Sequence, residues 1–514
     1  MPQTLMHHLG ALSPAKIVRL SGDTTIAVTA PFVEDSRAVE KGGVFVARKG
    51  LSADGHQYID KAIEQGAVAI IGEQAIDIDA VPYVQIRDAH LALGQLAASY
   101  YGFPSRQLTV FGVTGTNGKT TTTHLLHSIL KIWTKGKVGY ISTLGADFGG
   151  KSADTGLHVT TPHAPHIQKY LAQMLDSGLT HVILEMTSHG LEQGRLSGVD
   201  IDVSIVTNVT HEHLDFHGSF EAYQAAKGIM FQMLANSYRK PNIPKISILN
   251  QDDDSYSHYA KIKTDKVVTY SIKNHSDNQA FAIRYDPNKT YFAVDKTDFQ
   301  YKLFGEFNIY NALAAVATAR AIGIDDKTII KGLQAIDGVS GRMERIDEGQ
   351  DFIAIVDFAH TPDALEKALV AGRTMVKKGH RLIAVFGSAG LRDVEKRRMM
   401  AETSAKFADI TILTAEDPRT ESLKGILQEM ADGCLVQGGT EDKSFFRIPD
   451  RGEAIYQACQ MAKVGDVVMI CGKGHEQSMC FGTIEYPWDD RDALRAALLQ
   501  GKPLKTLPTA TQEN

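Results

Sequence analysis

Short apolar runs alternate with segments of helical periodicity along most of the chain. The runs between positions 106 and 250 lie at 108–113, 181–186, 203–208 and 246–250. A later series, in which each run precedes a helical pattern, lies at 352–358, 381–387, 409–414 and 466–471. Strands that alternate with helices are typical of a mainly parallel sheet covered on both faces. The pattern therefore predicts an α/β fold.

The first 105 residues have shorter apolar runs, at 44–47, 67–71 and 83–86, and end in the turn-rich segment 101–105. We interpret them as a separate small α/β domain. The length of 514 residues also suggests about three domains. We predict domains at 1–105, 106–337 and 338–500, followed by a polar tail at 501–514.

The charge and cysteine content of the chain indicate which kinds of ligand it binds. The 54 basic and 60 acidic residues are spread along the chain and form no basic stripe, which argues against nucleic acid and membrane surfaces. The four cysteines form no CxxC pair, as expected of reduced thiols without a zinc site. We find neither a signal-peptide pattern nor an apolar run of about 18 residues. We expect a cytoplasmic protein that binds small molecules.

A glycine-rich loop follows the strand predicted at 108–113 and opens a helix. Small residues in GVTGTNGKTT let backbone N–H groups approach phosphate oxygens, and the helix N-terminus adds partial positive charge. Its lysine would neutralise the β- and γ-phosphates, and the next hydroxyl would reach Mg²⁺. The strict pattern has glycine in place of Val113, and the alternative is a glycine-rich turn before an ordinary helix. We predict ATP and Mg²⁺ as ligands, with the ATP-binding residues Gly115, Thr116, Asn117, Gly118, Lys119, Thr120 and Thr121.

Two further polar side chains follow strands of the same predicted sheet. Glu185 comes just after one strand and His213 just after the next. The carboxyl ends of parallel strands are where such sheets bind ligands, and carboxylate and imidazole groups suit Mg²⁺ shared with ATP phosphates. For each residue taken alone, the alternative is a purely structural role.

The loop TGTNGKTT resembles the nucleotide loop of the Mur ligases and of the related folylpolyglutamate synthases, and the resemblance to Mur ligases extends over nearly the whole chain. Further matching segments are EMTSHGL at 185–191, GRME at 341–344, DFAHTPD at 357–363 and GKGHE at 472–476. The chain departs from the family pattern at Val159, Glu212, Ala389 and Leu391.

The resemblance implies an ATP-dependent ligase of peptidoglycan precursor synthesis, which adds a diamino acid to UDP-N-acetylmuramoyl-dipeptide through an acyl phosphate. It implies an N-terminal UDP-binding domain, a central P-loop ATPase domain and a C-terminal Rossmann-like domain. Asn311, Arg342 and Asp357 would contact the nucleotide. Lys227, which by itself would be interpreted as a solvated helix lysine, would be carbamylated. The implied catalytic set is Lys119, Glu185, His213 and Lys227, and the implied metal ligands are Thr120, Glu185, His213 and the Lys227 carbamate.

The resemblance also implies two substrate sites. The muramoyl-dipeptide would be bound by Ser36, Thr160, Thr161, Thr187, Gln193 and Arg195. The diamino acid would be bound by Arg392, Glu416, Asp417, Pro418, Arg419, Gly472 and Glu476.

The identity of the diamino acid depends on charges in the second site. Arg392 and Arg419 favour the distal carboxylate of meso-diaminopimelate, since arginine binds carboxylates in a bidentate geometry. Asp417 and Glu416 favour the distal ammonium of lysine or ornithine, unless Asp417 neutralises Arg419 internally. We favour meso-diaminopimelate and a monomeric enzyme. The alternatives are a folylpolyglutamate synthase-like ligase and a catalytically silent nucleotide-binding homologue.

Overall fold

The computed structural model describes residues 2–13, 16–50, 53–155, 159–210, 212, 214–286 and 289–505. The predicted metal ligand His213 and most of the predicted tail (506–514) lie outside the described residues. The chain forms two compact units, one comprising Met1–Gln279 and Leu313–Gly332, the other Ala280–Ala312 and Leu333–Asn514.

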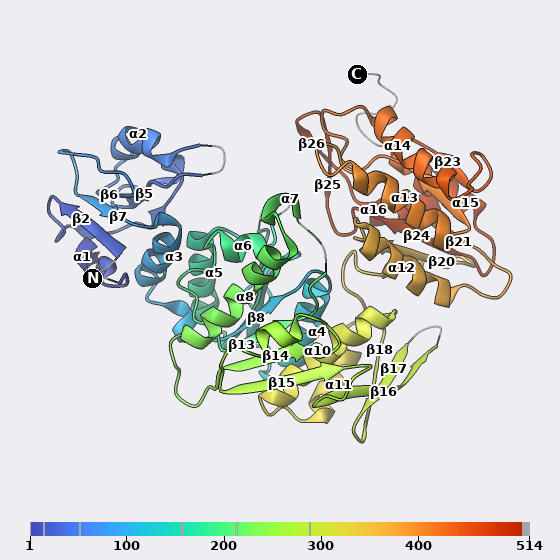
Figure 1. Cartoon of the computed structure of the whole chain (residues 1–514), viewed down its shortest axis with the longest axis horizontal. Coiled ribbons are helices and arrows are strands. Elements are labelled where there is room, and N and C mark those ends of the chain that lie inside the picture. The colour runs from blue at the N-terminus through green and yellow to red at the C-terminus, as the bar shows by residue number, and fades with distance from the viewer. Residues whose placement is uncertain are drawn as a thin grey trace. The chain divides into compact units, whose positions relative to one another are not determined.

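The N-terminal part of the first unit contains a sheet with helices on both faces (Figure 1). Its sheet has the order β2-β7-β6-β5-β4, in which only β2 is antiparallel to its neighbour. Helices α1 and α3 pack on one face and α2 on the other. The elements are β1 (Gln3–Thr4), α1 (Leu5–Leu9), β2 (Ile17–Ser21), β3 (Ala27–Val28), β4 (Phe32–Val33), β5 (Val44–Val46), α2 (Ile59–Glu64), β6 (Ala69–Gly72), β7 (Tyr83–Ile86) and α3 (Ala89–Tyr100).

A second sheet of this unit has the order β11-β10-β9-β12-β8-β13-β14-β15, and it is parallel from β9 to β15. Helices α5 and α8 pack against one face, while α4 packs against β8, β9 and β12. The elements are β8 (Thr109–Thr114), α4 (Lys119–Trp133), β9 (Val138–Ser142), β10 (Gly145–Asp147), β11 (Ser152–Ala153), α5 (Ala164–Asp176), β12 (His181–Glu185), α6 (Ser188–Glu192), β13 (Val203–Val206), α7 (Leu214–His217), α8 (Phe220–Asn236), β14 (Ile246–Asn250), α9 (Tyr256–Tyr259) and β15 (Lys266–Ser271).

The chain then forms an antiparallel β-meander that the apolar pattern did not predict. Strand β16 (Asn278–Tyr285) starts beside β15 and continues as a partner of β17 (Thr290–Val294), which pairs with β18 (Thr297–Tyr301). Helices α10 (Glu306–Ala321) and α11 (Asp326–Gln334) follow.

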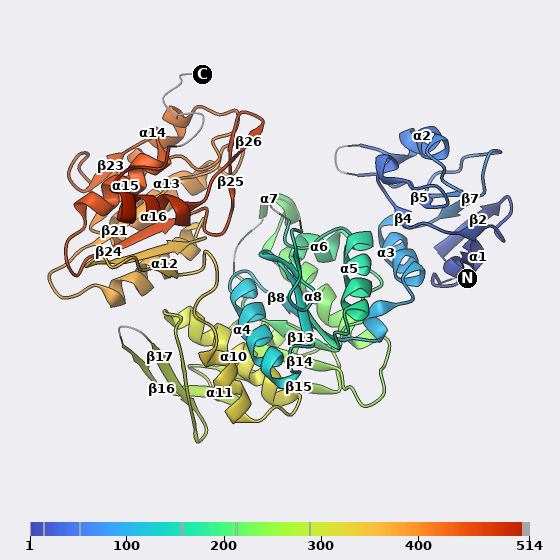
Figure 2. The same ribbon diagram turned by 180° about the vertical axis from the view of Figure 1, so that it is seen from behind.

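The rest of the second unit is a doubly wound domain. Its sheet has the order β19-β20-β24-β21-β22-β23 and is parallel apart from β19. Helices α12, α13 and α14 pack on one face, and α15 and α16 on the other (Figure 2). The elements are β19 (Glu344–Ile346), β20 (Ile353–Asp357), α12 (Pro362–Met375), β21 (Leu382–Phe386), α13 (Glu395–Phe407), β22 (Ile410–Leu413), α14 (Leu423–Val436), β23 (Phe445–Arg447), α15 (Arg451–Met461), β24 (Val467–Cys471), β25 (Ser478–Phe481), β26 (Ile484–Pro487) and α16 (Asp490–Gln500).

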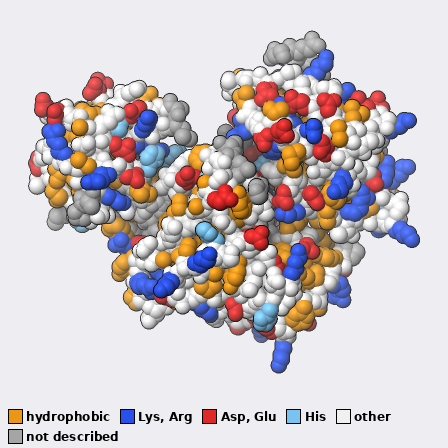
Figure 3. Space-filling view, in the orientation of Figure 1, with side chains coloured by type: hydrophobic (Ala, Val, Ile, Leu, Met, Phe, Trp, Pro, Cys, Tyr) orange, Lys and Arg blue, Asp and Glu red, His pale blue; other side chains and the backbone are white. Residues whose placement is uncertain are grey.

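The predicted α/β fold is confirmed, with a strand at each of the apolar runs. On the face drawn in Figure 3, acidic and basic side chains are interspersed and no basic stripe is visible. All four cysteines are buried free thiols. Within the described ranges, we find no helix with the length and apolar character needed to cross a bilayer.

Candidate functional site

The loop between β8 and α4 requires glycine at two positions. Gly115 has a φ of 148°, and a Cβ there would lie 1.9 Å from the Thr207 hydroxyl oxygen. Gly118 precedes α4 with a φ of 85°, in the left-handed region that glycine adopts without strain. Val113, by contrast, is buried within β8 and needs no special backbone conformation. The departure at Val113 therefore leaves the loop geometry intact.

Side chains that follow β13 fix this loop in place. The Thr207 hydroxyl and the Asn208 amide donate hydrogen bonds of 2.6 and 3.0 Å to the Asn117 carbonyl. The Asn208 side-chain oxygen accepts the Asn117 N–H at 3.0 Å. Asn208 was not predicted as a site residue, although its place just after a strand of the sheet was a usable signal.

Lys119 begins α4 and extends over the loop. Its ammonium donates hydrogen bonds to the carbonyl oxygens of Gly115 (3.0 Å) and Thr116 (2.9 Å). The Thr116 hydroxyl forms a 2.9 Å hydrogen bond with the Tyr223 hydroxyl. The loop thus combines backbone N–H groups, a helix N-terminus and an ammonium group, an arrangement suited to binding phosphate.

Glu185 lies at the end of β12, where it joins three other polar residues. The Thr120 hydroxyl donates to both carboxylate oxygens, at 3.0 and 3.1 Å. The Thr143 N–H and hydroxyl each donate to the carboxylate at 3.1 Å, and that hydroxyl lies 3.0 Å from the Thr160 hydroxyl. The structure therefore brings together three predicted residues, Thr120, Glu185 and Thr160. Thr143 was missed, although it follows β9 at the same edge of the sheet.

This cluster supplies the hard oxygen donors that Mg²⁺ prefers. In the part of the chain that the structure describes, no three His, Cys, Asp or Glu side chains converge as a metal-binding group. The predicted metal ligands do not require three such side chains among the described residues. They are Thr120 and Glu185, together with a modified lysine and His213. The oxygen donors that are described fit Mg²⁺.

Lys227 lies in α8 and is only 1% exposed, so its interpretation as a solvated lysine is wrong. Its ammonium donates a 2.8 Å hydrogen bond to the Gly115 carbonyl and lies 4.4 Å from the centre of the Tyr223 ring. Burial, and then the nearby Lys119 ammonium, hold the pKa of Lys227 well below its ordinary value, while Glu212 acts in the opposite direction. Lys119 and Lys227 thus both bind the Gly115 carbonyl.

The predicted dipeptide-binding residues of the central domain are connected to Glu185 by hydrogen bonds. The Thr161 hydroxyl donates to the Glu185 carbonyl at 3.1 Å and lies 3.0 Å from the Thr187 hydroxyl. Arg195 donates to the Thr161 carbonyl at 2.8 Å and to the Gln193 side-chain oxygen at 2.8 and 3.0 Å. These residues form one hydrogen-bonded group next to the phosphate loop.

A half-buried ionic cluster near Arg195 joins residues of the N-terminal domain to His163. Ser36, the predicted residue of this domain, is buried in a short 3₁₀ helix. The nearby Glu34 pairs with Arg48 and accepts a 2.6 Å hydrogen bond from His163. Burial alone would raise the pKa of Glu34, but the bonds from His163 and Arg48 lower it to about 2. Glu34, Arg48, His163 and Arg195 line one small pocket of this unit, and the first three were not predicted.

In the second unit, two predicted nucleotide residues meet at the end of β20. The half-buried Asp357 carboxylate accepts the N–H groups of Met343 (2.7 Å) and Ala359 (2.8 Å). The Arg342 guanidinium lies 4.4 Å from the centre of the Phe358 ring. Burial raises the pKa of Asp357, and Arg342 opposes that shift.

Asn311, the third predicted nucleotide residue of this unit, is buried in α10. Its amide donates a 2.9 Å hydrogen bond to the Asn308 side chain, whose own amide donates to the Phe304 carbonyl at 2.7 Å. Because α10 begins at Glu306, Asn308 lies inside the helix and does not cap its N-terminus.

The predicted amino-acid site lies at the carboxyl ends of β21, β22 and β24. Gly472 follows β24 with a φ of 111°, and a Cβ there would lie 2.2 Å from Oε2 of Glu416. Within the described ranges, this oxygen has no hydrogen-bond partner. Burial raises the pKa of Glu416 to about 7, although the cations of Lys396, Arg451 and Lys473 oppose the shift.

Asp417 does not neutralise Arg419, so the alternative of an internal ion pair between these two residues is wrong. Its carboxylate is bound by the Lys473 ammonium at 2.9 and 3.0 Å. Arg419 is half-buried and Arg392 is exposed; neither makes a side-chain ion pair with any residue for which the structure gives a position. Pro418 packs against Gly390, where a Cβ would lie 2.0 Å from the Pro418 carbonyl oxygen.

A buried ion pair supports the loop that holds Glu416. The Arg451 guanidinium binds both carboxylate oxygens of Asp490 at 2.7 Å and donates to the carbonyls of Ala415 (3.1 Å) and Cys471 (2.9 Å). Both charged side chains are fully buried.

Arg451→Ala is expected to lower the free energy of unfolding by about 3–5 kcal/mol, because Asp490 would remain as an uncompensated buried charge. The measurement is urea unfolding followed by Trp488 fluorescence in a Trp133→Phe background, since the Trp488 indole N–H donates to Asp490 at 2.8 Å. Arg398→Ala, which removes an exposed pair with Glu402, is the control. A loss below about 1 kcal/mol for Arg451→Ala contradicts this role.

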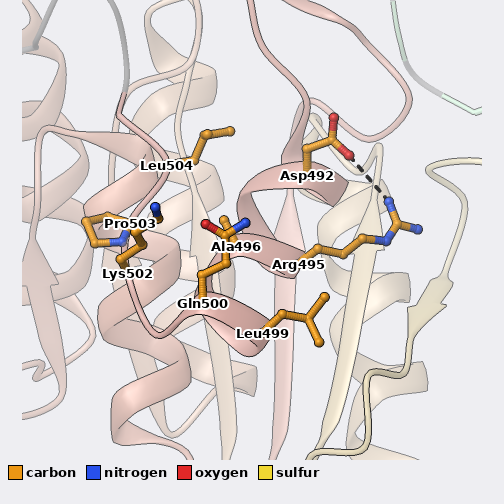
Figure 4. Close-up of a pocket in the computed structure, with 8 residues that line it drawn as sticks. All are labelled: Asp492, Arg495, Ala496, Leu499, Gln500, Lys502, Pro503 and Leu504. Carbon is orange, nitrogen blue, oxygen red and sulfur yellow. Dashed lines mark hydrogen bonds and ion pairs between the residues drawn. The ribbon is translucent and has the colours of Figure 1, made fainter.

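One groove of about 450 Å³ contains none of the predicted site residues. It lies along α16 and the segment 502–504, and it is lined by Asp492, Arg495, Ala496, Leu499, Gln500, Lys502, Pro503 and Leu504 (Figure 4).

Comparison with known proteins identifies the family. Three family models match: "Mur ligase family, catalytic domain" at 34–101, "Mur ligase middle domain" at 113–319 and "Mur ligase, glutamate ligase domain" at 341–474. A UDP-N-acetylmuramoyl-L-alanyl-D-glutamate--2,6-diaminopimelate ligase of Geobacillus thermodenitrificans is 41% identical over 468 residues, covering 90% of this chain and 94% of the relative. The chain belongs to the Mur ligase family. It is an ATP-dependent, amide-bond-forming ligase.

Solved structures agree with this Mur ligase assignment. A structure of a UDP-N-acetylmuramoyl-L-alanyl-D-glutamate--2,6-diaminopimelate ligase has a TM-score of 0.68 and 29% identity, with 98% of this chain and 99% of that chain covered. A Mycobacterium tuberculosis folylpolyglutamate synthase has a TM-score of 0.58 and 14% identity, with 74% of this chain and 92% of that chain covered. Similarity at 14% identity shows the fold alone, so the folylpolyglutamate synthase alternative is the weaker one.

Proposed function

We propose that this Mur ligase adds meso-diaminopimelate to UDP-N-acetylmuramoyl-L-alanyl-D-glutamate in peptidoglycan precursor synthesis, as a cytoplasmic monomer that uses Mg²⁺. The relatives named above support the dipeptide substrate. The observation that favours diaminopimelate is the pairing of Asp417 with Lys473, because it leaves the Arg419 guanidinium available for a distal carboxylate.

The proposed reaction has two steps. The terminal carboxylate of the dipeptide attacks the γ-phosphorus of ATP, which forms an acyl phosphate and releases ADP. The neutral amine of the diamino acid then attacks the acyl carbon, and collapse of the tetrahedral intermediate releases phosphate and leaves an amide. Correct orientation of the reactants can remove roughly 7–11 kcal/mol of such a barrier.

Residues of the phosphate loop bring the two anions together in the first step. The Lys119 ammonium and the N-terminus of α4 offset the charge of the γ-phosphate as the carboxylate approaches. Thr120, Glu185, His213 and a carbamate on Lys227 would hold Mg²⁺, which when bound supplies further positive charge at the phosphates. Thr160, Thr161, Thr187, Gln193 and Arg195 would orient the dipeptide. The hydrogen bond from Thr161 to the Glu185 carbonyl supports a position of the dipeptide carboxylate beside the loop.

The proposed function is tested by phosphate release from ATP with UDP-muramoyl-dipeptide, with and without each amino acid of a panel. We expect release that depends on both the dipeptide and meso-diaminopimelate. Release with pteroyl glutamates instead of the dipeptide would support a folylpolyglutamate synthase-like enzyme. The absence of turnover with every substrate would support a silent nucleotide-binding protein.

Arg419→Ala is expected to lower kcat/KM for meso-diaminopimelate by about 10–100-fold, the cost of losing hydrogen bonds to a charged group. The kcat/KM values for lysine and ornithine should change far less, because these substrates have no distal carboxylate. Arg398→Ala, an exposed arginine on α13, is the matched control. If lysine or ornithine is the preferred substrate and Arg419→Ala leaves that preference unchanged, the choice of diaminopimelate is wrong.

A further inference from the structure

The Lys473 side chain links the two loops of the predicted amino-acid site and is fully buried. Its ammonium lies 2.9 and 3.0 Å from the two carboxylate oxygens of Asp417 and 2.6 Å from a Glu476 oxygen. Asp417 and Glu476 were predicted to contact the incoming amino acid, whereas Lys473 was not. The pair with Asp417 connects residues 56 positions apart in the sequence, so no local pattern could predict it.

The charges in this cluster depend on one another. An isolated ammonium is costly to bury, and the two carboxylates compensate it. Burial alone would lower the pKa of Lys473, but Glu476 and Asp417 raise it above the ordinary value. Lys473 therefore remains a cation and neutralises Asp417.

The backbone directs the Asp417 carboxylate towards Lys473. Asp417 has a φ of 40°, in the left-handed region where Asp and Asn are the best tolerated of the residues other than glycine. One of its carboxylate oxygens also accepts the Cys480 N–H at 2.9 Å. The backbone N–H of the nearby Arg419 donates to the Cys480 carbonyl at 3.1 Å. The loop thus separates a neutralised carboxylate from a guanidinium without an ion-pair partner among the described residues.

We propose that Lys473 determines the amino-acid specificity of this ligase by neutralising Asp417. Resting on the proposed function above, this inference assigns the contact with the distal carboxylate of the incoming amino acid to Arg419. Without Lys473, the negative charge of Asp417 would repel that carboxylate and attract the distal ammonium of lysine or ornithine. Lys473 is thus a positioning residue that acts through Asp417.

The test is the ratio of kcat/KM for meso-diaminopimelate to kcat/KM for lysine, measured on the full-length enzyme with ATP and UDP-muramoyl-dipeptide. Lys473→Met should lower this ratio at least tenfold. Asp417→Asn, which fits the same backbone conformation, should leave the ratio within about threefold of wild type. The double variant Asp417→Asn/Lys473→Met should restore the ratio to that range. Lys463→Met, an exposed lysine of the same domain, is the control.

The proposal is overturned if folded Lys473→Met keeps the wild-type ratio, or if the double variant does not restore it. If Lys473→Met does not fold, the double variant decides, because it removes both charges of the pair. A low ratio in the double variant would then mean that Lys473 itself binds the distal carboxylate, which contradicts a role through Asp417. The proposed function fails separately, if wild type prefers lysine or releases no phosphate with any amino acid.

Discussion

Lys119→Ala is expected to lower kcat for ATP-dependent ligation by at least about 10²–10³-fold, the range found when a preorganised charge-stabilising group is removed. The ammonium lies over the phosphate loop, where it binds the carbonyls of Gly115 and Thr116. Its removal leaves the repulsion between the γ-phosphate and the attacking carboxylate uncompensated. Phosphate release measured under saturating substrates gives kcat directly.

The fold should survive this substitution, because the loop conformation depends mainly on Gly115, Gly118 and the bonds from Thr207 and Asn208. Thermal melting by circular dichroism should place Lys119→Ala close to wild type. Lys131→Ala, on the exposed side of the last turn of α4, is the matched control and should retain full activity. A folded Lys119→Ala protein with a near-normal rate would show that the phosphate-loop assignment is wrong.

The strands and the phosphate loop could be predicted because their signals are local. An apolar run such as 203–208 must be buried, and the glycines of the loop precede a helix within a few residues. The meander of β16 to β18 was missed because its strands are partly exposed and show no continuous apolar run. The left-handed conformations at Asp417 and Arg419 are also local, but the presence of an Asp or an Arg does not predict such a conformation.

The site was predictable where family motifs were present and less so where it depends on contacts across the fold. Glu185 and Thr160 are predicted residues, yet Thr143, which joins them, belongs to no motif and was missed. The partner of Asp417 was uncertain because Arg419 is close in sequence, separated from it only by Pro418, while Lys473 is distant. The burial of Lys227 also depends on contacts across the fold. Its place in a helix favoured exposure, and only tertiary packing buries it.

Lys227→Ala is expected to be nearly inactive, with kcat lowered by about 10²-fold or more, because the proposed carbamate would contribute negative charge to the Mg²⁺ site. Carbamylation requires a neutral amine, which attacks CO₂ to form the N–C bond and releases a proton. Burial and the nearby Lys119 ammonium depress the pKa of Lys227, which increases the neutral fraction of its amine near neutral pH. The unmodified ammonium would instead repel Mg²⁺.

Three measurements test the carbamate on the intact enzyme. Wild type in ¹³C-bicarbonate should show a carbamate signal by NMR that is absent from Lys227→Ala. Activity of wild type should fall when bicarbonate is removed, and it should fall further at lower pH, where the amine is protonated. Formate or acetate should partly restore Lys227→Ala, because a small carboxylate can occupy the space of the carbamate. Gln232→Ala, an exposed position on α8, is the control. A wild-type rate for Lys227→Ala would exclude the carbamate from catalysis, and Lys227 would then serve only to hold the Gly115 carbonyl.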